Sequence, residues 1–197
     1  MHSWNALDPV LLRPAGDIAA AFIRAGALDY RAAARFVSRL PYGRNFLARD
    51  PLVVMREGRG TCSTKHALLR RLAMEQDLKI SLVVGIYEMN AENTPGIGSV
   101  LERYQLVSLP EAHCYLRYCG KRVDITRDNG GRRELEFFLE EDIIPEQIGE
   151  YKAVLHRRFM QQWMTKSNVA GRRDLEELWR IREECIAALS RGMHRSF

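Results

Sequence analysis

The sequence predicts an α+β fold, because its helical and strand patterns fall in separate blocks instead of alternating along the chain. Helical periodicity dominates both ends of the chain. Between them, residues 79–89 and 113–126 are rich in β-branched and apolar residues, as strands are. A turn with glycines at positions 58 and 60 is expected to place a cysteine at the start of one helix. Helices are therefore expected to flank a block of strands.

Composition and charge are those of a globular protein. The 197 residues are 46% hydrophobic and 28% charged, which predicts a single domain with terminal additions. The net charge of +5 permits anionic partners, but basic and acidic residues are interleaved and no aromatic-and-basic patch stands out. We therefore expect no specific nucleic-acid binding.

Localisation is inferred from the N-terminus, the apolar runs and the cysteines. Residues 1–17 lack a basic segment followed by a long apolar run, so no signal peptide is expected. The longest apolar runs are too short to span a membrane, and no membrane partner is expected. The cysteines at positions 62, 114, 119 and 185 fit neither a metal-binding template nor a disulfide framework. A cytoplasmic protein with reduced thiols is the simplest inference.

Two helices are expected before the glycine turn, at residues 17–25 and 29–40. Asp17 suits the cap of the first helix and Gly26 suits its end, and a proline follows the second. Residues 44–60 are then expected to connect the second helix to the glycine turn.

Cys62 is expected at or just before the first turn of an amphipathic helix. Ser63 and Thr64 suit the capping region, and leucines recur at helical spacing while Arg70 and Arg71 lie on the other side. The N–H groups and the dipole at a helix N-terminus favour an anion, and an anion at Cys62 is a thiolate. A cysteine nucleophile needs that activation. The alternative is a small buried apolar residue, as cysteines often are.

Strand signals follow this helix. Residues 79–89 predict a strand that is buried on both faces. Residues 90–109 have no clear period apart from room for one helical turn, so we expect a long connection that borders the active cleft. Residues 113–118 and 122–126 predict two strands joined by a tight turn at residues 119–121.

The hairpin carries the remaining candidate chemistry. His113 lies at the start of one expected strand and Asp124 near the middle of the other, separated by ten residues, so both are expected near the same level. A carboxylate there would hold the imidazole in one tautomer, and the imidazole would take a proton from a thiol. Cys, His and Asp in this order suit acyl transfer through a thioester, with the Cys62 N–H as a local oxyanion donor.

These pieces, in their order and spacing, resemble the transglutaminase-like superfamily of papain-like cysteine enzymes over residues 35–126. The matching pieces are FVSRLPYG, GTCSTKHALLRRLA, VVGIY, His113 with an aromatic two residues later, and the Asp-Ile-Thr of residues 124–126. Two positions depart from the family pattern. Tyr115 stands where Trp is commoner, and Ile125 stands where Pro is usual.

The resemblance implies a papain-like core, with the cysteine helix packed on an antiparallel sheet. It implies Cys62 as the nucleophile, His113 as general base and acid, and Asp124 as the orienting carboxylate. It also places a further oxyanion donor upstream, at Tyr42 or Asn45. Residues 1–34 and 127–197 have no counterpart, which leaves a C-terminal helical extension of about residues 145–190 without an assigned role.

No metal and no cofactor are expected. A zinc cluster of Cys62, His66, His113 and Cys114 is disfavoured, because adjacent residues of a strand point to opposite faces. The structural alternatives are a strand-edge histidine at His113 and a surface carboxylate at Asp124.

The expected activity is acyl transfer at an amide or ester bond through a thioester on Cys62. Water would resolve the thioester in a peptidase, amidase or deamidase, and an amine would resolve it in a cross-linker or amide synthase. Hydrolysis is favoured because water is always available. The substrate would be a peptide, a protein or a small amide, and the sequence predicts no oligomeric state. The alternative is a non-catalytic protein-binding module that retains the fold.

Overall fold

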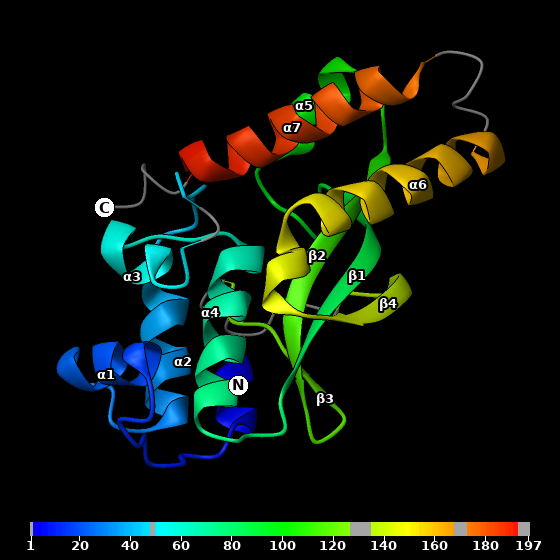
Figure 1. Cartoon of the computed structure of the whole chain (residues 1–197). Coiled ribbons are helices and arrows are strands. Elements are labelled where there is room, and N and C mark those ends of the chain that lie inside the picture. The colour runs from blue at the N-terminus through cyan, green and yellow to red at the C-terminus, as the bar shows by residue number, and fades with distance from the viewer. Residues whose placement is uncertain (1, 48–49, 127–134, 168–172, 193–197) are drawn as a thin grey trace. The chain divides into compact units, whose positions relative to one another are not determined.

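The structure is a computed structural model that describes residues 2–47, 50–126, 135–167 and 173–192. Its fold is α+β, as predicted. The described residues form a four-stranded antiparallel sheet with strand order β3-β2-β1-β4, together with seven α-helices (Figure 1). The chain divides into two compact units: unit 1 comprises residues 1–84, 114–131 and 141–149, and unit 2 comprises residues 85–113, 132–140 and 150–197. The single domain expected from the sequence stays a prediction.

Unit 1 is built around one central helix. Its helical elements are η1 (Ser3–Ala6), α1 (Asp17–Arg24), α2 (Tyr30–Arg39), α3 (Val53–Glu57), α4 (Cys62–Glu75) and η2 (Pro145–Ile148). Helix α4 contacts α1, α2, α3 and η2 (Figure 1). Helix α1 ends before Gly26 as expected, since this glycine has a φ of +82°. Helix α2 begins where the Asp29 carboxylate accepts the N–H of Ala32.

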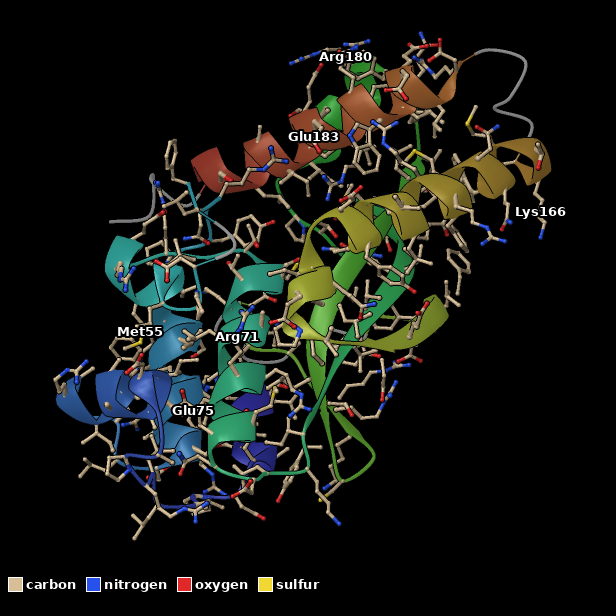
Figure 2. All side chains as sticks on the ribbon, viewed as in Figure 1. Met55, Arg71, Glu75, Lys166, Arg180 and Glu183 are labelled. Atoms are coloured by element: carbon tan, nitrogen blue, oxygen red, sulfur yellow. The ribbon has the colours of Figure 1, made fainter. Side chains whose placement is uncertain are left out.

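The cap of α1 differs from the prediction. Asp17 is the first helical residue and does not cap the helix, whose N-cap is Gly16. The Glu75 carboxylate, from the far end of α4, accepts the N–H groups of Ile18 and Ala19 at 3.1 and 2.7 Å. Figure 2 shows Glu75 near the end of α4 that lies beside α1. A side chain distant in sequence thus replaces the local cap.

Two further predictions in unit 1 were wrong. The expected connection at residues 44–60 contains the short helix α3. Helix α4 is not amphipathic, because ten of its fourteen residues are buried. Even Lys65 and His66 are fully buried, since helices cover α4 on several sides. Arginines 70 and 71 are the exceptions near its middle.

The sheet matches most of the strand predictions. Its strands are β1 (Ser81–Asn90), β2 (Ser108–Tyr118), β3 (Lys121–Val123) and β4 (Phe137–Ile143). Strand β1 is buried over most of its length, as expected. Strands β2 and β3 form an antiparallel hairpin in which Leu116 lies opposite Val123. Its two turn residues, Cys119 and Gly120, both have positive φ, as a two-residue hairpin turn requires. Strand β3 ends before Asp124, which was expected near the middle of a strand.

Unit 2 contains the helices α5 (Gly98–Arg103), α6 (Glu150–Lys166) and α7 (Leu175–Gly192). Helix α7 contacts both α5 and α6. The expected long connection at residues 90–109 is shorter, because α5 interrupts it and the side chains of Ile97, Val100 and Leu101 are buried. The helical extension expected from about residue 145 starts with the short η2, and α6 itself begins at Glu150. Within the described ranges, no helix has both the length and the apolar composition needed to cross a membrane.

Candidate active site

Cys62 is the first residue of α4, and its side chain is buried. The Thr61 hydroxyl accepts the Thr64 N–H at 3.3 Å, and the Thr64 hydroxyl accepts the Thr61 N–H at 3.0 Å. This reciprocal pair is a capping box that fixes the end of the helix. Thr64 therefore takes part in the cap as expected, but the N-cap itself is Thr61, which its spacing of three from Thr64 could have revealed.

The glycine turn before Cys62 has a steric cause. A Cβ atom at Gly60 would lie 2.9 Å from Cγ of Lys65 and 3.1 Å from Cγ2 of Val54. Only glycine therefore lets the chain pass between α3 and α4 at this point. The turn is also held by backbone bonds, since the Gly60 N–H donates to Pro41 and the Gly60 carbonyl accepts from Gly43.

Asn45, one of the two expected oxyanion donors, fastens this turn. Its Nδ2 donates to the Arg59 carbonyl at 2.9 Å and to the Glu57 carboxylate at 3.2 Å. Its Oδ1 accepts the Thr64 hydroxyl at 2.7 Å. Because an amide nitrogen has two hydrogens, Asn45 would have to release one of these bonds to donate to an oxyanion. Tyr42, the other expected donor, is buried, and both oxyanion assignments stay predictions.

Asp124 lies just beyond β3, in unit 1. Its Oδ1 accepts the Thr126 N–H at 2.9 Å and lies 3.6 Å from Nε2 of His66. Its own N–H donates to the Ser3 hydroxyl at 2.8 Å. The Asp124 side chain is 36% exposed, whereas that of His66 is fully buried. The carboxylate thus remains partly accessible, and it is the next residue, Ile125, whose backbone bonds to His66 of α4.

His66 is held in one tautomer by two backbone groups. Its Nδ1 lies 2.8 Å from the Cys62 carbonyl, which can only accept, so Nδ1 carries the proton. Its Nε2 accepts the Ile125 N–H at 2.9 Å. The neighbouring Lys65 donates from Nζ to the Leu40 carbonyl at 2.6 Å and to the Thr126 carbonyl at 2.9 Å. The contacts of His66 and Lys65 were not predicted, because only the packing around α4 shows that these polar residues are buried.

His113 was expected at the start of a strand, but it lies in the middle of β2, which begins at Ser108, and it belongs to unit 2. Its ring meets the Tyr87 ring edge-to-face, with centroids 6.2 Å apart, and Phe137 packs on Tyr87 in the same manner. The next residue of β2, Cys114, belongs to unit 1, where its Sγ accepts from the Ser63 hydroxyl at 3.5 Å.

A buried ion pair precedes His113 in the same unit. Nε and Nη2 of Arg182, on α7, each donate at 2.6 Å to the two oxygens of Glu111, on β2. Burial raises the pKa of Glu111, but the charge and hydrogen bonds of Arg182, aided by His156 and Lys152, lower it to about 2. Nε2 of His156, on α6, donates to the Pro110 carbonyl at 2.8 Å. Burial lowers the pKa of His156, against the opposing effect of Glu111.

Among the described residues, no group of three or more His, Cys, Asp and Glu side chains could hold a metal ion. No family model matches the sequence, and no curated protein and no solved structure matches it either.

Proposed function

We propose that the protein is a cysteine-dependent acyl-transfer enzyme with a transglutaminase-like, papain-like core. The observation that carries this proposal lies within unit 1. Cys62 occupies the first position of a capped helix, and the segment that contains Asp124 is hydrogen-bonded to the same end of that helix. A helix N-terminus favours the thiolate, which is the nucleophilic form of cysteine.

In the proposed reaction, Cys62 is the nucleophile, His113 serves as base and then as acid, and Asp124 orients His113. His113 takes the proton of the Cys62 thiol, and the sulfur attacks the carbonyl carbon of an amide or ester. The N–H groups at the start of α4 stabilise the negative oxygen of the tetrahedral intermediate. His113 then returns the proton to the leaving amine or alcohol as the C–N or C–O bond breaks, which leaves a thioester on Cys62. Asp124 orients the imidazole and stabilises its charged form.

The fate of the thioester distinguishes the possible activities. Attack by water, with His113 now acting as base, releases an acid and restores the thiol. The protein would then act as a peptidase, amidase or deamidase on a peptide, protein or small amide. This chemistry needs no cofactor, and a reduced thiol suits the cytoplasm.

Trapping the acyl intermediate tests the proposal. The full chain is mixed with p-nitrophenyl acetate, nitrophenol release is followed in the first turnover, and peptide mass spectrometry locates the acetyl group. We expect a burst of nitrophenol with acetylation at Cys62, which Cys62→Ser abolishes and Asp124→Asn slows. Cys114→Ser changes another buried cysteine and is the matched control, which should retain the burst.

The binding-module alternative makes the opposite prediction. Without a burst, or with acetylation scattered over lysines and Cys119 and none at Cys62, the protein is not an acyl-transfer enzyme. The fold would then serve to bind a protein partner.

A further inference from the structure

Residues 124–126 are held in place by side chains. They continue the chain beyond β3, which ends at Val123, yet each of their three backbone N–H groups has an acceptor. The acceptors are the Ser3 hydroxyl, the His66 imidazole and the Asp124 carboxylate, in chain order. Buried backbone groups must be paired, and here side chains replace the partner strand.

Two of the side chains that bond this segment come from α4, within about one helical turn of Cys62. His66 accepts the N–H of Ile125, and Lys65 donates to the carbonyl of Thr126. Both side chains are fully buried, so water does not compete for these bonds. Together, His66 and Lys65 bond to one N–H group and one carbonyl group of the segment.

The His66 ring also contacts the backbone of the nucleophile. Its Nδ1–H donates to the Cys62 carbonyl, while its Nε2 accepts from the residue that follows Asp124. A planar ring of fixed dimensions thus spans the distance between the Cys62 backbone and the Asp124 segment. Its full burial keeps it from contacting a substrate.

We propose that His66, assisted by Lys65, is a positioning residue for the reaction: it holds the Asp124 carboxylate at a fixed place relative to the helix that carries Cys62. This inference rests on the proposed function. His66 acts through Asp124, and a small displacement of an orienting group is enough to slow catalysis strongly.

Two substitutions of His66 test its two hydrogen bonds one at a time. Asn has its amide nitrogen where His has Nδ1, so His66→Asn can keep the bond to Cys62 but loses the acceptor for Ile125. Gln has its carbonyl oxygen where His has Nε2, so His66→Gln can keep the bond from Ile125. The measured quantity is the rate of Cys62 alkylation by iodoacetamide between pH 5 and pH 9.

In His66→Gln, we expect Cys62 to be alkylated at a rate within about threefold of that in the wild type. In His66→Asn, we expect Cys62 to be alkylated about 100-fold more slowly than in the wild type near neutral pH. The slow variant should also need a higher pH to react, as an ordinary thiol does. In an Asp124→Asn background, the difference between the Gln and Asn variants should vanish. Tyr30→Phe is the matched control, because it removes a buried bond to the Leu69 carbonyl of α4 without touching residues 124–126.

The outcomes distinguish the inference from the proposed function. If wild-type Cys62 is reactive but His66→Asn behaves like Tyr30→Phe, His66 is only structural and the inference is overturned. If wild-type Cys62 reacts no faster than Cys119, the proposed function fails and the inference fails with it. A measurement on the wild type does not depend on variants that fold: ¹H–¹⁵N spectra should place the neutral His66 proton on Nδ1, and a proton on Nε2 overturns the inference.

Discussion

The two units contain buried polar clusters of opposite construction. In unit 1, Lys65 and His66 bond to backbone carbonyl and N–H groups of the Asp124 segment, of Cys62 and of Leu40, the residue that follows α2. In unit 2, Arg182 and Glu111 bond to each other, side chain to side chain. We call the first the backbone clamp and the second the buried ion pair.

One cluster bonds to backbone groups and the other joins two side chains, so substitutions should affect the stability of the two clusters differently. Both members of a side-chain ion pair can be exchanged for apolar residues, and such exchanges are often neutral or stabilising. Backbone groups cannot be removed by substitution, so losing a clamp side chain always leaves a buried carbonyl or N–H without its partner. The backbone clamp therefore fixes one geometry, whereas the ion pair fastens α7 to β2 just before His113.

The largest loss of stability is expected when one member of the buried ion pair is removed. Arg182→Met leaves the Glu111 carboxylate buried without its counter-charge and should lower the free energy of unfolding by about 3–5 kcal/mol. Urea unfolding near pH 7 measures this loss. The double variant Glu111→Leu with Arg182→Met should recover most of it, and a double variant as unstable as the single one would contradict the comparison.

The second-largest loss of stability is expected at low pH, where the carboxylate of the buried ion pair becomes protonated. The pKa of Glu111 is about 2 in the folded state, below its ordinary value of 4.5, so its stabilisation is complete above about pH 4.5 and is lost as the pH falls towards 2. The pKa of His156 is also lowered, so its neutral form is favoured and its contribution falls as the pH drops below about 6.5.

The expected loss from Glu111 is about 3 kcal/mol over this range. Urea unfolding at pH 7, 5 and 3 measures it. The double variant without the ion pair is the control, and its stability should fall less steeply below pH 4.5. Parallel curves for the two proteins would show that the ion pair is not the acid-sensitive element.

Loss of the clamp lysine should lower the free energy of unfolding by about 2–3 kcal/mol, because Lys65→Met leaves the buried Thr126 carbonyl and the partly buried Leu40 carbonyl without their donor. No second substitution should restore stability, since both partners are backbone groups. Lys65→Arg tests whether any donor suffices. A Lys65→Met protein as stable as wild type would remove the contrast with the ion pair.

The smallest effect is expected at the surface. Arg71, labelled on α4 in Figure 2, pairs with Glu146 of η2. Their side chains approach to 3.1 Å, and that of Glu146 is 64% exposed. Arg71→Ala should lower stability by less than about 1 kcal/mol, because water screens such pairs. It is the matched control for both buried clusters, and a loss comparable to that of Lys65→Met would mean that burial is not the deciding factor.

Local signals explain what the sequence could predict. Gly26 ends α1 and Cys119–Gly120 closes the β2–β3 hairpin, each through a backbone conformation set within a few residues. Features that depend on distant partners were missed. The cap of α1 comes from Glu75, and the partners of Lys65 lie 25 and 61 residues away along the chain.

In the candidate site, too, local features could be predicted from the sequence and features that depend on distant residues could not. The position of Cys62 at a helix start follows from the turn and cap around it. Asp124 was predicted near the middle of a strand but lies just beyond the end of β3, because β3 is only three residues long and side chains bond the residues that follow it. The role proposed for His66 could not be seen in the sequence, since its pairing with Ile125 exists only in the folded chain.

The most direct test of acyl-transfer chemistry at Cys62 is its alkylation rate as a function of pH, compared within one protein with Cys119 and Cys185. Burial raises the pKa of Cys185 to about 11, which should make it slow to react, and the exposed Cys119 is the readily accessible comparison. Limiting iodoacetamide at pH 6, followed by peptide mass spectrometry, gives all three rates in one experiment. We expect Cys62 to be labelled first despite its burial. Preferential labelling of the exposed Cys119, with Cys62 unmodified until the protein unfolds, would contradict it.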